Sequence, residues 1–170
     1  TVRQLNGTVN IISDPGKGTK ICLYLPLCRQ AGMQSKDKGL IPEVKPLRIL
    51  MIDDEDLLLQ LGKDLMGRLN HTVLAERNPE KALEIFASDW QNFDLVVLDM
   101  MMPEMNGRDV FLQLKEINPT VKVLIISGYN LINTAEELIR SGVMGVLAKP
   151  FTEDELRAKL ASIFAGVEAN

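Results

Sequence analysis

The sequence predicts a doubly wound α/β fold built on a five-stranded parallel sheet. Between residues 47 and 166, short apolar runs alternate five times with segments of helical periodicity. The runs are apolar without interruption, which is typical of strands covered on both faces. This (βα)5 alternation favours a parallel sheet with helices on both sides and right-handed crossovers.

The first two strand–helix units are predicted from residue 48 onward. Residues 48–52 form an apolar run before an acidic cluster, and leucines then recur at helical spacing over residues 58–69. Residues 72–75 form a weaker strand. Asn78 before Pro79 indicates a helix start, because asparagine caps free N–H groups and proline has none to leave unpaired.

The other three units repeat the alternation. We expect their strands and helices at residues 95–98, 110–117, 121–126, 136–141, 143–148 and 156–164. Ligands of such folds bind beyond the carboxyl ends of the strands. The polar residues at these strand ends are therefore the candidates for a site.

The N-terminal part has a different character. Residues 8–27 read as two β-rich runs around an Asp-Pro-Gly-Lys-Gly turn, which predicts a β-hairpin. Residues 29–46 lose periodicity and accumulate Gly, Lys, Gln and Pro, as linkers do. We therefore expect a hairpin segment at 1–28, a linker at 29–46 and the main domain at 47–166.

Charge and composition exclude several function classes. Residues 1–46 carry a net charge of +4, while residues 47–170 carry −8. An acidic main domain argues against nucleic-acid binding by this chain. We expect no membrane segment and a cytoplasmic location, which leaves an anchor elsewhere in a parent protein open. Cys22 and Cys28 lack the spacing of a zinc site or a disulfide framework.

Five polar residues stand at predicted strand ends: Asp53, Asp54, Asp99, Ser127 and Lys149. Three converging carboxylates require a cation, and Mg²⁺ suits hard oxygen ligands. The lysine and the hydroxyl could then bind phosphoryl oxygens. Each residue alone has an ordinary explanation as a helix-start acid, a loop acid, a turn serine or a solvated lysine. Together they predict phosphoryl transfer to a carboxylate.

Four segments carry a resemblance to a known family. LRILMIDDED, LVVLDMMMPEMNG, VLIISGY and AKPF resemble the signature blocks of response regulator receiver domains of two-component systems, over residues 47 to about 166. The resemblance implies a flavodoxin-like fold with strand order 2-1-3-4-5. It also implies that Asp99 is the phosphoacceptor and that Ser127 and Lys149 contact the phosphoryl group.

The same resemblance implies a Mg²⁺ or Mn²⁺ site. Asp54, Asp99 and the backbone carbonyl of Met101 would be direct ligands, and Asp53 would act largely through water. The bond before Pro150 would be cis, which is accessible to X-Pro bonds.

One position departs from the family pattern. Val146 stands where the family often has a Tyr or Phe that reorients on activation. Switching would then rest on Ser127 and the loop before the fourth helix. Met101 and Tyr129, each two residues beyond a site residue, are expected to influence the lifetime of the phosphoryl group by controlling water access.

The N-terminal segment LNGTVNIISDPGKGTKICLYLPL resembles the last strands of the ATP-binding domain of histidine kinases, where Gly16, Gly18 and Thr19 fit. An ordinary hairpin with a Gly-rich turn is the alternative. The order of segments is that of a hybrid histidine kinase. The chain lacks a kinase catalytic core, so we expect no ATP binding. His71 lacks the surroundings of a phosphodonor site and is expected to be structural or solvent-exposed.

The function that these residues predict is a phosphoacceptor receiver in a phosphorelay. Its partner would be a histidine kinase or a histidine phosphotransfer protein, and the domain would catalyse its own phosphorylation and dephosphorylation. An aspartate-based phosphohydrolase is one alternative, but such enzymes typically carry a second acid where Met101 stands. The other is a receiver-like binding module that works without phosphorylation.

Overall fold

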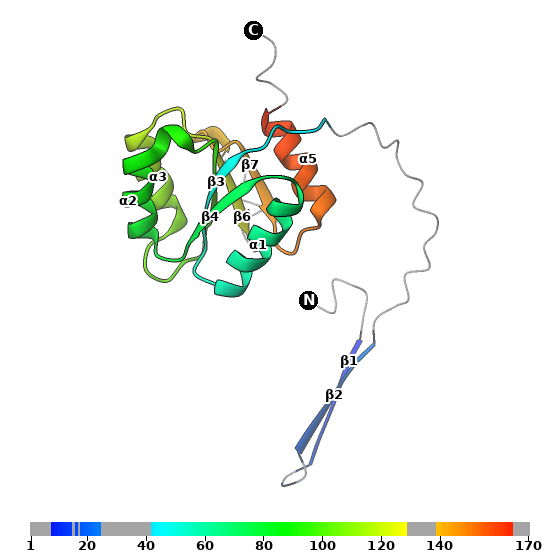
Figure 1. Cartoon of the computed structure of the whole chain (residues 1–170). Helices are drawn as coiled ribbons and strands as arrows, with labels where there is room; N and C mark the ends of the chain where they lie inside the picture. The colour runs from blue at the N-terminus through cyan, green and yellow to red at the C-terminus, as the bar shows by residue number, and fades with distance from the viewer. Residues whose placement is uncertain (1–7, 15, 17, 25–41, 129–138, 165–170) are drawn as a thin grey trace. The chain divides into compact units, whose positions relative to one another are not determined.

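The computed structural model of the chain describes residues 8–14, 16, 18–24, 42–128 and 139–164 (Figure 1). The chain divides into two compact units, Thr1–Gly39 and Leu40–Asn170. The predicted linker lies outside the described residues as far as residue 41. Its last residues belong to the larger unit, where Val44 packs against the core.

The larger unit contains a five-stranded parallel sheet in the order β4-β3-β5-β6-β7. The strands are β3 (Arg48–Ile52), β4 (Thr72–Glu76), β5 (Leu95–Asp99), β6 (Val123–Ser127) and β7 (Gly145–Ala148). In chain order this is 2-1-3-4-5, so the predicted fold is confirmed. Strand β6 begins two residues later than predicted because the N–H of Val121 donates to the carbonyl of Asn118 in a turn (3.1 Å).

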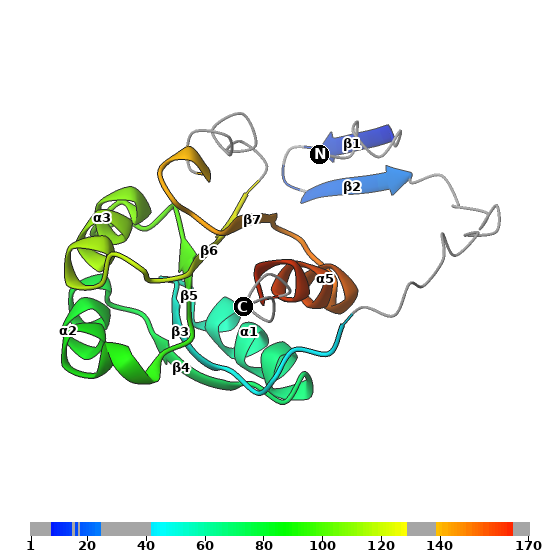
Figure 2. The same cartoon turned by 90° about the horizontal axis from the view of Figure 1, so that it is seen from above.

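Helices cover both faces of this sheet. They are α1 (Asp56–Arg68), α2 (Pro79–Asp89), α3 (Gly107–Ile117) and α5 (Glu153–Phe164), with a short 3-10 helix, η2 (Trp90–Asn92), after α2. Figure 2 shows α2 and α3 on one face and α1 and α5 on the other. Of the predicted helix at 136–141, residues 136–138 lie outside the described residues, Ile139 and Arg140 are helical, and Ser141 lies in a turn. None of the described helices is long and apolar enough to cross a membrane.

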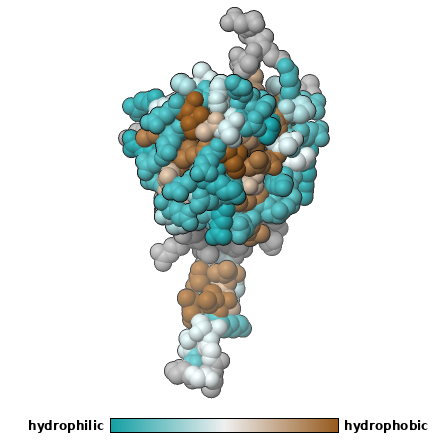
Figure 3. Space-filling view, turned by 60° about the vertical axis from the view of Figure 1, so that its left-hand side comes forward, coloured by the Kyte–Doolittle hydropathy of each residue, from teal (hydrophilic) through white to brown (hydrophobic). Residues whose placement is uncertain are grey.

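The smaller unit holds the predicted hairpin. Strands β1 (Thr8–Asp14) and β2 (Gly18–Tyr24) pair antiparallel, and Val9 lies opposite Leu23 and Ile11 opposite Ile21. These four side chains share one face and are 43–62% exposed. Figure 3 shows hydrophobic surface, in brown, on the hairpin. A two-stranded hairpin is marginally stable in water by itself.

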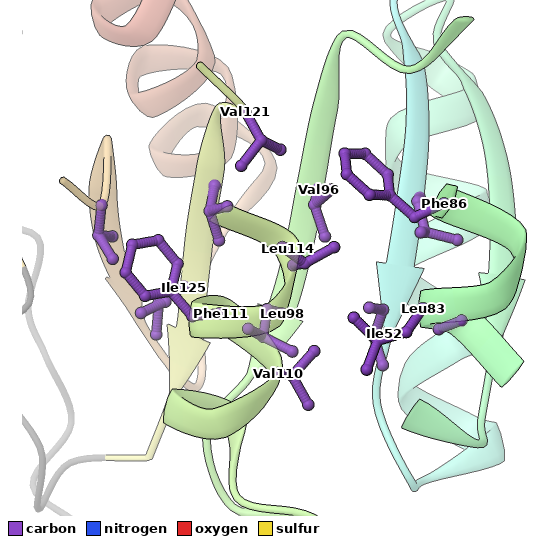
Figure 4. Packing of buried hydrophobic residues seen from close by; sticks show 14 of the residues in the cluster. Ile52, Leu83, Phe86, Val96, Leu98, Val110, Phe111, Leu114, Val121 and Ile125 are labelled. Atoms are coloured by element: carbon purple, nitrogen blue, oxygen red, sulfur yellow. The ribbon is translucent and has the colours of Figure 1, made fainter. Parts of the chain in front are cut away.

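The core forms two layers because alternate side chains of each strand point to opposite faces. Leu50 and Ile52 of β3 pack toward α2 and α3, whereas Ile49 and Met51 pack toward α1 and α5. Figure 4 shows side chains of α2 and α3 meeting those of β3, β5 and β6. Each buried aliphatic side chain contributes about 1.5–3 kcal/mol. The paired layers thus fix the strands whose ends carry the site.

Polar residues are rare in this core. Among the described residues, the buried polar or charged ones are Asp53, His71, Asp99 and Ser127. Three of these four lie at the carboxyl ends of neighbouring strands β3, β5 and β6. Burial of such groups is costly unless they are paired, so their grouping at one edge marks a site.

Candidate functional site

The turn after β3 presents two carboxylates. Asp53 is 1% exposed, and its Oδ1 accepts a hydrogen bond from the N–H of Glu55 (3.0 Å), which turns the chain toward α1. Asp54 is half-buried and lines a cavity of about 750 Å³ together with residues of the β4–α2 and β5–α3 loops, such as Asn78 and Glu104. The two neighbouring acids therefore differ in access to solvent.

Asp99 is the last residue of β5 and is 6% exposed. Its Oδ2 accepts a hydrogen bond from the N–H of Met101 (3.1 Å). The side chain of Met101 itself is 72% exposed. The backbone after β5 thus holds the Asp99 carboxylate in place while the Met101 side chain stays in solvent.

Lys149 joins two of the carboxylates. Its Nζ lies 2.7 Å from Asp53 Oδ2 and 3.1 Å from Asp99 Oδ1, and its side chain is 21% exposed. Burial alone would lower the pKa of this ammonium, but the hydrogen bond to Asp53 and the charge of Asp99 raise the pKa above its ordinary value. Lys149 is therefore a fixed positive charge between β3 and β5.

The three carboxylates suit a divalent cation. Asp53, Asp54 and Asp99 each offer an oxygen, and these oxygens lie within 4.8 Å of one another. Lys149 offsets only one of the three negative charges. Carboxylate oxygens on two adjacent strand ends are the hard donors that Mg²⁺ or Mn²⁺ prefers. The donor set therefore fits the ion that the sequence predicts.

Ser127 ends β6 and is 2% exposed. Within the described part of the chain, its hydroxyl donates to the carbonyl of Gly128 at a long distance (3.5 Å), whereas its own carbonyl accepts a short hydrogen bond from the N–H of Lys149 (2.7 Å). The hydroxyl is thus held at the edge of the sheet with capacity for a stronger acceptor.

Of the remaining predicted residues, Val146 lies on β7 and Pro150 lies two residues after its end. Val146 is half-buried and packs on the side of α2 and α3. The bond between Lys149 and Pro150 is cis. Tyr129 lies outside the described residues.

His71 lies just before β4, at the amino end of the strand, whereas the acidic cluster lies at the carboxyl ends of β3 and β5. It is 8% exposed, and its Nδ1 accepts a hydrogen bond from the N–H of Leu47 (3.2 Å). The sequence left open whether His71 has a structural role or is exposed to solvent. Its burial and its hydrogen bond support the structural role.

Gly107 is a site residue that sequence reasoning missed. A Cβ at this position would lie 2.4 Å from the carbonyl oxygen of Asp99 and 2.7 Å from Cα of Met100. Only glycine therefore lets the start of α3 lie against the backbone of the acceptor residue. Asn106 before it caps α3, since its Oδ1 accepts from the N–H of Arg108 (2.9 Å). The Asn-Gly pair was the available signal.

A comparison with known domain families matches residues 49–161 to the response regulator receiver domain. Among solved structures, a response regulator receiver domain protein from Clostridium thermocellum is 30% identical, with a TM-score of 0.66. That match covers 71% of this chain and 95% of the solved one.

Curated relatives include two kinds of signalling protein. Sensor kinase CckA of Brucella abortus is 28% identical over 165 residues, which cover 91% of this chain and 17% of the relative. Transcriptional regulatory protein ZraR of Klebsiella oxytoca is 32% identical over 117 residues, which cover 69% of this chain and 26% of the relative. The chain thus spans only about a sixth to a quarter of the length of these relatives.

Proposed function

Because the chain belongs to the response regulator receiver domain family, we propose that Asp99 accepts a phosphoryl group from a phosphohistidine. The observation that carries this proposal is the contact of one half-buried ammonium, Lys149 Nζ, with both Asp53 and Asp99 beside a third carboxylate. Such an arrangement stabilises charge that develops on a transferring phosphoryl group.

In the proposed transfer, a carboxylate oxygen of Asp99 forms a bond to phosphorus while the bond from phosphorus to the histidine nitrogen breaks. The electron pair of that bond stays with the imidazole, which takes up a proton. Lys149, already 3.1 Å from Asp99 Oδ1, offsets the charge of the phosphoryl oxygens. The Ser127 hydroxyl, whose present acceptor is 3.5 Å away, donates to another oxygen.

We assign the cation to Asp54, Asp99 and the Met101 carbonyl as direct ligands, with Asp53 acting through water. The indirect role of Asp53 is supported by the short contact that already joins it to Lys149. When bound, Mg²⁺ or Mn²⁺ supplies positive charge that offsets the carboxylates and the phosphoryl oxygens.

Signalling would depend on Ser127 rather than on an aromatic side chain. Val146 has no ring to reorient, and it is already packed against the core. Movement of the Ser127 hydroxyl toward a phosphoryl oxygen would therefore be the local event that changes the surface. The partner is a histidine kinase or a histidine phosphotransfer protein, in the cytoplasm and without nucleic-acid contact by this chain.

A hybrid histidine kinase is the proposed parent, with residues 1–28 as the end of its ATP-binding domain, 29–46 as a linker and 47–166 as the receiver. Two relatives, Sensor kinase CckA and Aerobic respiration control sensor protein ArcB of Escherichia coli, align with 91% and 93% of the chain. The larger unit holds 131 of 170 residues, or 77%, so both alignments extend into the smaller unit. The ZraR match covers 69% and needs no such extension.

The test is intact-mass analysis after incubation with acetyl phosphate, with and without Mg²⁺. We expect one phosphoryl adduct that requires the ion and that is absent from Asp99→Asn. Asp109→Asn, which changes an exposed carboxylate in the first turn of α3, is the matched control and should keep the adduct.

A folded protein that forms no adduct with acetyl phosphate or with a phosphohistidine donor would contradict the proposal. The binding-module alternative would then be favoured. An adduct that persists in Asp99→Asn would instead show that another residue is the acceptor.

A further inference from the structure

The described methionines differ widely in exposure, and three of them, Met100, Met101 and Met102, directly follow the acceptor in the chain. Met101 is 72% exposed and Met144 is 46% exposed, while Met105 is half-buried. The other described methionines are at most 8% exposed: Met51, Met66, Met100 and Met102. Because thioether oxidation follows access to solvent, Met101 is the described methionine most open to an oxidant.

The backbone of the same residue holds the acceptor. The N–H of Met101 donates to Asp99 Oδ2 at 3.1 Å, so its side chain branches from the chain two residues beyond the reacting carboxylate. Met105 differs in that its sulfur already accepts from Gln113 Nε2 (3.7 Å). A chemical change at the Met101 sulfur would therefore occur beside the site, in a side chain that packing does not hold.

We propose that Met101 is an oxidation site, at which hydrogen peroxide converts the thioether to a sulfoxide and thereby shortens the lifetime of the phosphoryl group on Asp99. The oxygen–oxygen bond of the peroxide breaks, one oxygen bonds to sulfur, and the other leaves as water with both protons. Sulfur is oxidised by two electrons and the peroxide is reduced by two. The proposal rests on Asp99 as the proposed phosphoacceptor.

The physical cause is the change in polarity of an exposed side chain whose own N–H contacts the acceptor carboxylate. A thioether is a weak acceptor and orders little water, whereas the sulfoxide oxygen is a strong acceptor. Water held near the acyl phosphate is the nucleophile of its hydrolysis, and an apolar group beside it limits this access. Oxidation therefore speeds hydrolysis without changing the residues that accept the phosphoryl group.

The test uses the full chain, treated with a low dose of hydrogen peroxide and mapped by peptide mass. We expect Met101 to gain one oxygen before any other methionine that the structure describes. After loading with acetyl phosphate and Mg²⁺, the oxidised chain should lose its phosphoryl group at least about twofold faster than the untreated chain. Met101→Gln, which places a polar acceptor there permanently, should also show the faster decay.

Two variants separate the proposed site from general oxidation damage. In Met101→Leu, the ratio of decay rates after and before peroxide should be one, whatever its own starting rate. Met144→Leu, which removes the other methionine that is exposed among the described residues, should keep the full response. Thermal midpoints of each sample check that the fold persists.

Oxidation of another described methionine before Met101, or an oxidised Met101 with unchanged decay, would overturn the proposal. Neither result would affect the acceptor assignment, because the untreated chain reports that separately through its adduct. Loss of the adduct in untreated Asp99→Asn remains the test of the proposed function itself.

Discussion

Lys149 supplies positive charge that offsets part of the negative charge of the acidic cluster. Its Nζ contacts Asp53 and Asp99, which are 2% and 6% exposed in their side chains. Truncating one partner of a buried ion pair leaves the other charges without compensation, which is costly. The lysine should therefore matter for stability as well as for chemistry.

We predict that Lys149→Met lowers the free energy of unfolding by about 2–3 kcal/mol without a divalent ion. Millimolar Mg²⁺ should restore much of that loss, because the ion replaces the missing positive charge. Urea unfolding with and without Mg²⁺ measures both effects. Lys81→Met is the control, since it removes an exposed lysine from a pair with Glu76 that is worth about 1 kcal/mol. Equal stability of Lys149→Met and the parent chain without Mg²⁺ would contradict the prediction.

His71 gives the fold a pH-dependent contribution. Burial lowers the pKa of its imidazole, and the charge of Asp94 offsets only part of that effect. The unfolded chain therefore takes up a proton near pH 6.5 while the folded chain does so at lower pH. It follows that stability from His71 is present above about pH 6.5 and is lost as the pH falls toward the folded-state pKa.

We predict that His71→Asn is less sensitive to pH in this range than the parent chain. Asparagine can still accept from the N–H of Leu47, but it does not titrate. Urea midpoints at about pH 7.5 and about pH 5.5 should differ less in the variant, while carboxylate contributions stay common to both chains. If the urea midpoints of the parent chain and of His71→Asn change equally between the two pH values, His71 is not the source of the pH dependence.

At the scale of elements, the start of α3 is fitted against the end of β5. Gly107→Ala would place a methyl group 2.4 Å from the carbonyl oxygen of Asp99, so the backbone must shift. We predict a loss of about 1–3 kcal/mol in unfolding free energy, together with slower formation of the phosphoryl adduct. Gly67→Ala is the matched control, since nothing lies within 4 Å of its Cβ position in α1. It should stabilise by about 0.5–1 kcal/mol. Equal effects of the two substitutions would contradict the close-packing explanation.

The sequence predicts the elements well where a local signal exists. Asn78 caps α2 as expected, with its Oδ1 accepting from the N–H of Lys81 (2.8 Å). At the start of α5, Thr152 and Glu155 form a capping box, in which the N–H of Thr152 donates to Glu155 Oε2 (2.7 Å) and the N–H of Glu155 donates to Thr152 Oγ1. Its Thr-x-x-Glu spacing is visible in the sequence, but we did not predict it. The spacing of a few neighbouring residues is sufficient to predict where such helices begin.

Contacts between distant segments could not be predicted in the same way. The rule that ligands bind at strand ends places Lys149 near the aspartates, yet its sharing between Asp53 and Asp99 depends on side-chain positions 96 and 50 residues away in the chain. The hydrogen bond that His71 accepts likewise comes from Leu47, 24 residues earlier. The need for glycine at position 107 depends on the path of the β5–α3 connection.

At the scale of the whole molecule, the two units differ in how they can be stable. The larger unit buries two apolar layers on a five-stranded sheet, whereas the hairpin exposes the apolar side chains of Val9, Ile11, Ile21 and Leu23. A hairpin of this kind is marginal without a covering layer. The stability that a denaturant measures should therefore come from the larger unit.

We predict that deleting residues 1–39 leaves the urea midpoint of the remaining chain unchanged and leaves the phosphoryl adduct intact. Mg²⁺ should raise the free energy of unfolding equally in both chains, by about 2.7 kcal/mol at a hundredfold excess over its dissociation constant, since an ion that binds only the folded state stabilises it by mass action. Parallel urea titrations with and without Mg²⁺ measure this. A lower midpoint in the deleted chain, or a smaller response to Mg²⁺, would mean that the N-terminal segment contributes to the receiver fold or to its ion site. Equal responses would support a self-sufficient receiver beginning at about residue 40, because all ion-ligand candidates in the described chain lie beyond that point.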